Sequence, residues 1–321
     1  MKAMTYRKYG SPDVLSLENV PMPTFGDDGV LARVRAASVN PLDWHFLRGQ
    51  PYIVRTSSGL RTPKRNIPGV DVAGVVEAIG SGVTALRVGD EVWGEKSRAC
   101  AEYVAGPERL FIAKPAHITF EEAAAIPAAG VTALQALRDK GNVKPGQKVL
   151  VNGASGGVGT FAVQIAKADG AEVTGVTSSP NVEMVRSLGA DHVIDYTAGD
   201  FTRGSTRYDL IIDNAANRSL RSMRRVLTPT GTLVLVGASK GKWIAPIARM
   251  FAAGILSRFG SQRLLGHLTD TRREDLETMN ELIASGKVKP MIDRCYPLAE
   301  VPEAIRYLET MRARAKVIIQ V

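Results

Sequence analysis

A glycine-rich turn between two apolar segments is the feature that most restricts the fold of this chain. Residues 148–152 are mostly apolar, residues 153–159 have the sequence Gly-Ala-Ser-Gly-Gly-Val-Gly, and apolar residues then recur at helical spacing up to Ala166. Glycines allow a tight turn and a close backbone approach to a ligand, while a helix N-terminus offers free N–H groups to an anion. The pattern therefore predicts a strand, turn and helix that hold the pyrophosphate of a dinucleotide.

Two other glycine-loop motifs were compared with the same turn. A Walker A loop needs Gly-Lys-Ser/Thr, and here Thr160 follows Gly159 directly. The stretch from Gly153 to Gly157 matches Gly-x-Ser-x-Gly, the nucleophile elbow of α/β-hydrolases. A serine hydrolase with Ser155 as its nucleophile therefore stays an alternative, although neither His192 nor His267 lies in an obvious catalytic loop.

Short apolar segments alternate with amphipathic ones after the turn. Alternation of this kind predicts a parallel, doubly wound Rossmann sheet with helices on both faces. The expected strands, each buried on both faces, are residues 148–152, 172–176, 192–195, 209–213 and 232–236. Residues 1 to about 120 are instead rich in short β-type runs broken by Gly and Pro, which indicates a barrel-like β domain.

The end of the chain returns to β-type segments, and we assign it to the β domain. A strand is expected near residues 291–295, a helix over 301–310 and a last strand over 316–321. The predicted domains are 1–122, completed by 288–321, and 123–287. No uncharged apolar run reaches the ~18 residues of a membrane span, and with two cysteines in 321 residues we expect a cytoplasmic protein.

The net charge of +9 is partly concentrated in residues 240–273. This segment interleaves Lys and Arg with Trp, Ile, Met and Phe, which predicts one or two basic amphipathic helices. Three interpretations stay open: a surface for anionic lipid or nucleic acid, a lid over an apolar pocket, or a packed helix with its charges in solvent. The charge alone does not require a nucleic-acid partner, and we expect none.

The end of the second expected strand bears on the choice of dinucleotide. NAD-binding proteins commonly place Asp or Glu there, but this chain has Thr177-Ser178-Ser179-Pro180. Hydroxyls can bond a 2′-phosphate that a carboxylate would repel. The sequence thus favours NADP(H) over NAD.

Several motifs occur together in one order along the chain. They are Asn40, the stretch 89–92 (Gly-Asp-Glu-Val), the stretch 124–134, the glycine turn, and the stretch 188–191 (Leu-Gly-Ala-Asp). In this order the sequence resembles the medium-chain dehydrogenase/reductase superfamily, and most of all its zinc-free quinone oxidoreductase and enoyl-reductase-like branch. The resemblance implies a GroES-like β-barrel catalytic domain beside the Rossmann domain.

The resemblance also bears on zinc. Zinc-dependent members have a Cys where this chain has Asn40, and Gly-His-Glu where it has Gly69-Val70-Asp71. The stretch that matches their four-cysteine structural loop contains only Cys100. We therefore expect no zinc site, and expect Cys100 and Cys295 to be buried as small hydrophobic residues.

The resemblance implies roles for particular residues. Asn40 would lie near the nicotinamide and hydrogen-bond to substrate or ordered water, and His45 stands where the branch often has a tyrosine and could donate a proton. These two are the predicted catalytic residues. The predicted cofactor-binding residues are Thr132, Gly153, Ser155, Gly156, Gly157, Val158, Gly159, Ser178, Ser179, Tyr196, Asn214, Gly237 and Ser239.

The function implied is zinc-independent hydride transfer from NADPH to a small electrophile, a quinone or an α,β-unsaturated carbonyl. Alternatives are an alcohol or aldehyde reductase of the same fold, the serine hydrolase, and a nucleotide-sensing or RNA-binding protein on a reductase fold. An edge strand in the nucleotide domain makes a homodimer the expected assembly.

Overall fold

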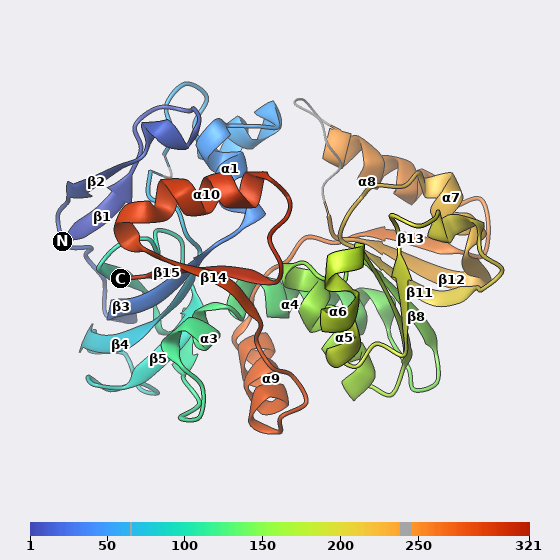
Figure 1. The fold of residues 1–321 in the computed structure, drawn as a ribbon. Helices are drawn as coiled ribbons and strands as arrows, with labels where there is room; N and C mark the ends of the chain where they lie inside the picture. The colour runs from blue at the N-terminus through green and yellow to red at the C-terminus, as the bar shows by residue number, and fades with distance from the viewer. Residues whose placement is uncertain (65, 238–244) are drawn as a thin grey trace. The chain divides into compact units, whose positions relative to one another are not determined.

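The computed structural model describes residues 1–64, 66–237 and 245–321, without the side chains of 245–247. The chain forms two compact units (Figure 1). Unit 1 comprises Met1–Ala128, Thr271–Ala284 and Pro290–Val321, and unit 2 comprises Ala129–Asp270 and Ser285–Lys289. Each is described by itself.

Unit 1 is built on a seven-stranded sheet of order β14-β15-β3-β4-β5-β7, with β6 paired to β3. Its strands are β3 (Gly29–Val39), β4 (Asp71–Ile79), β5 (Glu91–Glu95), β6 (Tyr103–Pro107), β7 (Phe111–Ala113), β14 (Ile292–Pro297) and β15 (Lys316–Gln320). Register shifts between β3 and β4 mark bulges, which bend long strands and help to curve a sheet. A separate hairpin pairs β1 (Lys2–Thr5) with β2 (Ser16–Asn19).

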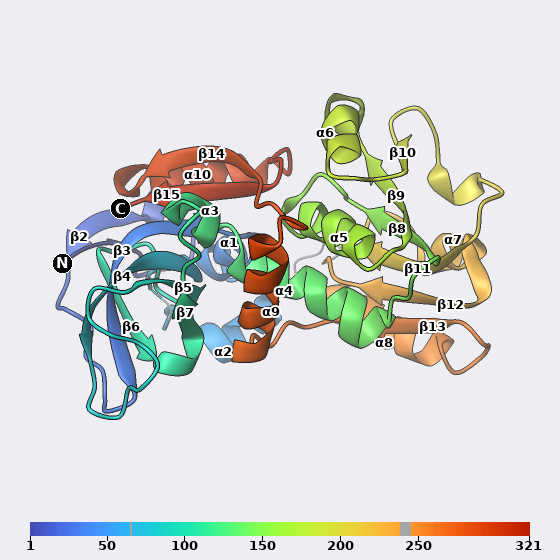
Figure 2. The ribbon, with the colours of Figure 1, turned by 90° about the horizontal axis from the view of Figure 1, so that it is seen from below.

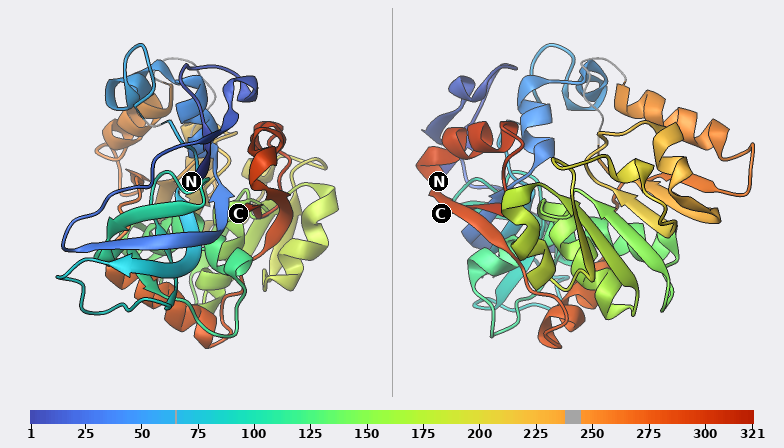
Figure 3. Two further views of the ribbon diagram at one scale, coloured as in Figure 1. Left: turned by 90° about the vertical axis from the view of Figure 1, so that its left-hand side faces the viewer. Right: turned by 45° about the vertical axis from the view of Figure 1, so that its right-hand side comes forward.

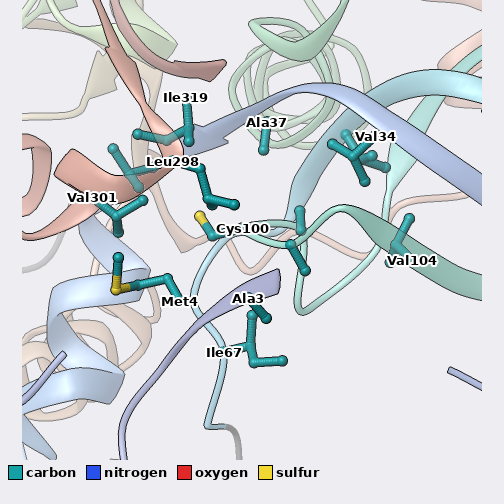
Figure 4. Close-up of a cluster of buried hydrophobic side chains, with 14 of the residues drawn as sticks. Ala3, Met4, Val34, Ala37, Ile67, Cys100, Val104, Leu298, Val301 and Ile319 are labelled. Atoms are coloured by element: carbon teal, nitrogen blue, oxygen red, sulfur yellow. The ribbon is translucent and has the colours of Figure 1, made fainter. Parts of the chain in front are cut away.

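Helices and a dense apolar cluster complete unit 1. The helices are α1 (Pro41–Arg48), α2 (Arg55–Ser58), α3 (Phe120–Ala124), α9 (Arg273–Ala284) and α10 (Val301–Glu309). Figure 4 shows Cys100 surrounded by side chains from both ends of the chain, including Met4, Val301 and Ile319. Cys100 is buried as expected, whereas Cys295 is exposed and that part of the expectation is wrong. Both termini belong to this unit (Figure 3).

Unit 2 contains a six-stranded parallel sheet of order β10-β9-β8-β11-β12-β13 (Figure 2). Its strands are β8 (Lys148–Asn152), β9 (Glu172–Thr177), β10 (His192–Asp195), β11 (Tyr208–Asp213), β12 (Leu227–Leu235) and β13 (Arg263–Gly266). The doubly wound sheet predicted from the apolar runs is confirmed. One detail is wrong: β10 is an edge strand that is only partly buried, so His192 lies exposed beside Glu172.

Helices cover both faces of this sheet. They are α4 (Pro127–Gln135), which begins at the end of unit 1 and continues as a π-helical turn (Ala136–Gly141), then α5 (Gly157–Ala168), α6 (Val182–Ser187), α7 (Leu220–Arg225) and α8 (Ala245–Leu256). Right-handed crossovers place α5 and α6 on one face and α7 and α8 on the other. Met223 of α7 and Ala253 of α8 accordingly share one apolar cluster with Ile211 and Leu233 of the sheet.

The observed units differ from the predicted domains in three places. Residues 123–128 and 271–284, which include α9, group with unit 1, although the prediction placed both in the nucleotide domain, and residues 288–289 group with unit 2 instead of the β domain. Three hydrogen bonds explain the position of α9: Trp93 Nε1 donates to Asn280 Oδ1, Asn280 Nδ2 donates to the Ala113 carbonyl, and Arg273 donates to the Phe111 carbonyl. No helix in the described part of the chain is long and apolar enough to cross a membrane.

Candidate cofactor site and a buried polar network

The glycine turn of unit 2 leaves no room for side chains at the points where the sequence has none. Gly153 follows β8 with φ +81°, a left-handed conformation that favours glycine. A Cβ on Gly159 would lie 2.1 Å from the Gly153 carbonyl oxygen, so α5 packs directly on the turn. A Cβ on Gly156, the residue before α5, would meet nothing nearer than 3.6 Å. The turn is therefore closed toward the helix and open at Gly156.

Asn214 lies beside this turn, directly after β11. A Cβ on Gly153 would be 3.5 Å from the Asn214 Cβ, and a Cβ on Gly237 would lie 2.0 Å from the Asn214 carbonyl oxygen. The Asn214 side-chain atoms Nδ2 and Oδ1 are both buried, and neither has a hydrogen-bond partner among the described residues. Buried amides without a partner are costly, so this one marks a place where a polar ligand would satisfy it.

Ser155 lies in the turn with hydroxyl and amide groups rather than with a base. Thr177 Oγ1 donates to the Ser155 oxygen at 2.8 Å, and Asn181 Nδ2 approaches the same oxygen at 3.3 Å and Ser178 Oγ at 3.2 Å. A serine nucleophile needs a histidine or another base to remove its proton. No base is bonded to Ser155 among the described residues, so the hydrolase interpretation loses its support.

A carboxylate that the sequence analysis overlooked stands beside the predicted phosphate site. Ser179 Oγ donates to Asp195 Oδ2 at 2.5 Å, and both the N–H and the hydroxyl of Thr197 bond to Asp195 Oδ1. These bonds hold the pKa of the exposed Asp195 carboxyl below its ordinary value. Tyr196, the next residue, is 42% exposed. Because β9 and β10 are adjacent parallel strands, their carboxyl ends lie side by side. Ser179 and Thr197, which are 18 residues apart in sequence, meet there.

Thr132 and a buried histidine meet at the end of β13. The Thr132 hydroxyl is 2.7 Å from the Thr269 hydroxyl, and Thr269 Oγ1 is 3.4 Å from His267 Nε2. Burial lowers the pKa of His267, and its Nδ1 is buried with no partner in the described part of the chain. No local pattern connects Thr132 with this histidine, since the two residues are far apart along the chain.

Asp213, the last residue of β11, holds α8 to the sheet. Arg249 Nη2 lies 2.6 Å from Asp213 Oδ2, and Asn152 Nδ2 donates to the other carboxylate oxygen at 2.7 Å. Burial raises the pKa of the Asp213 carboxyl, and Arg249 opposes that rise. One arginine of the basic 240–273 segment is therefore a structural ion-pair partner. The predicted cofactor residue Ser239 lies outside the described residues.

Unit 1 contains a buried polar network around Asn40. Lys316 Nζ donates to Asn40 Oδ1 at 2.5 Å and to Asp71 Oδ2 at 2.8 Å. Asn40 Nδ2 donates to Asp71 Oδ2 at 3.0 Å and to Ser38 Oγ at 3.4 Å, and the Ala128 N–H donates to Asp71 Oδ1. The amide hydrogens of Asn40 are therefore engaged, and Oδ1 keeps only a second lone pair for another donor.

Asp43 extends this network to the start of α1. Its two carboxylate oxygens accept the N–H groups of Asn40 and Gly69, each at 2.7 Å. Burial raises the pKa of Asp43 to about 6, partly opposed by those two hydrogen bonds. The residues that replace the zinc ligands of the resembling enzymes thus surround an ammonium group. Among the described residues no group of three His, Cys, Asp or Glu side chains could hold a metal ion.

His45 lies one turn along α1 and is half-buried. Its Nδ1 is 2.7 Å from the Gln50 carbonyl oxygen, which can only accept, so Nδ1 carries the proton. Burial lowers the pKa of the ring. In the neutral ring, Nε2 is then an acceptor and has no proton to give.

Comparison with known proteins identifies both parts of the chain. Residues 26–136 match the family model of the alcohol dehydrogenase GroES-like domain, and residues 188–319 match the model described as zinc-binding dehydrogenase. The chain is 36% identical over 334 residues to the 2-methylene-furan-3-one reductase of Solanum lycopersicum, an alignment that covers 99% of this chain and 79% of that protein.

Two solved structures share the whole fold. The quinone oxidoreductase of Coxiella burnetii superposes with a TM-score of 0.88 at 32% identity, covering 100% of this chain and 99% of that one. The Escherichia coli quinone oxidoreductase, solved as a complex with NADPH, gives a TM-score of 0.85 at 26% identity and covers 100% of both chains. These matches confirm the predicted pairing of a GroES-like domain with a Rossmann-like domain.

Proposed function

Because the chain belongs to the medium-chain dehydrogenase/reductase superfamily, in its quinone oxidoreductase-like branch, and is an NAD(P)-dependent oxidoreductase, we propose that it reduces quinones or α,β-unsaturated carbonyls with NADPH and without zinc. The observation that carries the proposal is the open glycine turn beside the unpartnered amide of Asn214. The names of the similar proteins, a furanone reductase and two quinone oxidoreductases, support the substrate class.

The described residues of unit 2 fit a dinucleotide. The N–H groups of Gly157 and Val158, at the start of α5, face the pyrophosphate, and Gly156 lets it approach. Asn214 would satisfy its amide on the cofactor, and Thr132 would lie beside the nicotinamide. When bound, the cofactor supplies the hydride.

Asp195 affects one part of the proposal above all, the preference for NADPH over NADH. Ser178 and Tyr196 offer hydroxyls to a 2′-phosphate, whereas Ser179 donates its hydroxyl hydrogen to Asp195, whose carboxylate repels the phosphate. Because Ser179 and Thr197 already bond that carboxylate, its charge is partly shielded. We therefore propose a moderate preference for NADPH, supported by the NADPH complex of the Escherichia coli protein.

The two predicted catalytic residues, Asn40 and His45, have little hydrogen-bonding capacity left for a substrate. Asn40 can accept one further hydrogen bond, from a substrate hydroxyl or an ordered water, while Lys316 and Asp71 hold its amide in place. His45 at neutral pH has no proton on Nε2, so the proton that follows the hydride comes from solvent. His45 becomes a donor only below its lowered pKa.

The side chains at the positions of the zinc ligands support zinc independence, although the matching family model is described as zinc-binding dehydrogenase. Asn40 and Val70 are poor zinc ligands, and the charge of Asp71 is already compensated by Lys316. Reduction of an acceptor that is already electrophilic needs less Lewis-acid help than oxidation of an alcohol. Activity that survives a strong chelator, with no zinc found by elemental analysis, is the expected result.

The central test is a titration with NADPH and NADH followed by an acceptor panel of quinones, enones and aldehydes. We expect tighter NADPH binding and turnover with quinones or enones. Gly156→Ala should weaken cofactor binding with little change in stability, and Gly199→Ala, at an open position of the same unit, is the matched control. Tighter binding of NADH, or turnover confined to alcohols with added zinc, would contradict the proposal.

Assembly and location complete the proposal. In the described part of the chain β13 pairs only with β12, so its other edge is available to a second copy, and we propose a homodimer in the cytoplasm. Equilibrium sedimentation and cell fractionation test these two points. A nucleotide sensor without activity would bind NADPH and consume none of it with any acceptor of the panel.

A further inference from the structure

The positive charge of the chain is concentrated in one stretch of unit 2. Residues 214–269 contain nine Lys and Arg and no Asp or Glu, a number equal to the net charge of +9. The rest of the chain has 32 of each sign and is balanced. A surface formed by this stretch therefore faces solvent with charge of one sign.

Helix α8, within that stretch, exposes large apolar side chains. Phe251 is 70% exposed, Ile255 58% and Phe259, just past the helix, 75%. Residues four apart lie on one side of a helix, so Phe251 and Ile255 are neighbours, and Phe259 follows in the turn after the helix. Phe251, Ile255 and Arg258 line one shallow hollow. We call Phe251, Ile255, Phe259 and Arg258 the α8 face.

The α8 face points away from the sheet. On the opposite side of the helix, Ala253 is fully buried and Leu256 packs against the apolar cluster under α7 and α8. Figure 1 shows the two helices as neighbours over the sheet. The apolar side chains of the α8 face are thus additional to those needed for the core.

Two exposed arginines lie near the end of α8. Arg258 lines the hollow, and Arg263 precedes Leu264, whose N–H bonds Ser257 Oγ. Neither forms an ion pair with a described residue, whereas Arg249 is bound by Asp213 in the interior. An exposed apolar patch marks an interaction surface, and the positive charge beside it favours a partner that is both apolar and anionic.

We propose that the α8 face docks on an anionic lipid surface. The three apolar side chains enter the boundary between headgroups and acyl chains, and Arg258 and Arg263 bind lipid phosphates. The contact is peripheral and reversible, since three side chains and one short helix cannot span a bilayer. It does not depend on the reaction that the enzyme catalyses.

Two other occupants fit the same observations less well. A second copy on a two-fold axis through the α8 face would bring like charges together with no carboxylate to compensate them. Pairing through the edge of β13 uses backbone groups and leaves the outer side of α8 free. A nucleic acid would match the arginines but leave the apolar side chains in water.

The test uses the full chain and vesicles of phosphatidylcholine with phosphatidylglycerol in equal parts, against pure phosphatidylcholine vesicles. We expect cosedimentation with the anionic vesicles only, weakened by salt. The triple variant Phe251→Ser, Ile255→Ser, Phe259→Ser should bind at least about tenfold more weakly. Arg258→Glu with Arg263→Glu should weaken binding at least about 25-fold.

Matched controls carry the same changes on unit 1. Leu17→Ser, Val88→Ser and Met311→Ser replace exposed apolar residues, and Arg87→Glu with Arg109→Glu reverses exposed charges. Both controls should bind vesicles as the unchanged chain does. Circular dichroism of each variant shows whether it folds, and the salt dependence of the unchanged chain needs no variant.

Three results would overturn the proposal. One is equal binding to neutral and anionic vesicles, or none to either. Another is a dimer that the apolar triple variant converts to a monomer, which would make the α8 face a contact between copies. The last is tighter binding to a DNA or RNA oligonucleotide that depends on the arginines and not on the apolar side chains.

Discussion

The ammonium group of Lys316 lies 2.8 Å from a carboxylate oxygen of Asp71, and the two side chains are 3% and 0% exposed. They come from β15 and β4, which are not adjacent in the sheet, since β3 lies between them. Asn40 and Ser38, at the end of β3, bridge the gap through their own bonds to Asp71. This ion pair therefore fastens three strands at one point.

Removal of the Lys316 charge should destabilise unit 1. Lys316→Met leaves the Asp71 carboxylate buried without its cation, and loss of one partner of a buried pair costs about 3–5 kcal/mol. Urea unfolding measures the loss, with Lys8→Met as an exposed control. The double variant Lys316→Met, Asp71→Asn should recover part of the stability. A loss below about 1 kcal/mol in the single variant would contradict the interpretation.

Asp43 should make stability fall as the pH rises. Its folded pKa of about 6 exceeds the ordinary value of 3.8, so the folded state binds more protons between these values. Stability is therefore higher below pH 4 by as much as ~3 kcal/mol from this group, is lost progressively up to pH 6, and stays reduced above it. In Asp43→Asn this pH-dependent term should disappear, although one backbone N–H loses its acceptor. An unchanged slope of the unfolding free energy against pH would argue against a raised pKa.

His45 should be the Nδ1–H tautomer with a pKa below 6.5, its ordinary value. Nitrogen chemical shifts of labelled histidine report both the tautomer and the midpoint. The pH profile of turnover should then show no step from His45 above pH 6.5, and His45→Asn should leave that part of the profile unchanged. A midpoint above 6.5, or a step that His45→Asn removes there, would restore His45 as a proton donor at neutral pH.

Two glycines of the turn should respond differently to a methyl group. Gly159→Ala places a Cβ 2.1 Å from the Gly153 carbonyl oxygen, so α5 must shift and both stability and cofactor affinity should fall. The stability loss is expected to be about 1–3 kcal/mol, the range for overpacked sites. Gly156→Ala meets only ordinary contacts and should reduce affinity alone. Thermal unfolding with and without NADPH separates the two effects, and equal stability losses would argue against the packing described.

Most strands of unit 2 could be predicted because local patterns determine them. The predicted bounds of β8 and β10 coincide with the structure, and those of β9 and β11 differ by one residue, since apolar runs bounded by Gly, Asp or Asn mark strand ends well. The strand β12 begins five residues before its predicted start at 232. The position of a strand in the sheet depends on distant partners. The burial predicted for both faces of β10 was therefore wrong, because β10 lies at the edge of the sheet. The burial predicted for Cys295 was wrong as well.

The parts of the site that backbone turns and strand ends form could be predicted from the sequence. The glycine turn and Asn214 follow directly from strand ends, which the sequence marks. Lys316 binds Asp71 across 245 residues, and no local pattern indicates such a pair. One signal was present: Lys316 is a charged residue opening an otherwise apolar strand. Asp195 was missed because it ends β10, one strand further along the chain than β9, where NAD-binding proteins commonly place the carboxylate.

The position of β15 has a consequence for the order in which the chain folds. β15 pairs with β3 and carries Lys316 to Asp71, yet the ribosome makes it after all of unit 2. The parallel sheet of unit 2 can therefore form during synthesis. At that stage the first 128 residues still lack the cation that pairs with Asp71 and the strand that pairs with β3. A nascent chain arrested before Lys316 should hold a protease-resistant unit 2 and a protease-sensitive N-terminal region, whose closure requires β15.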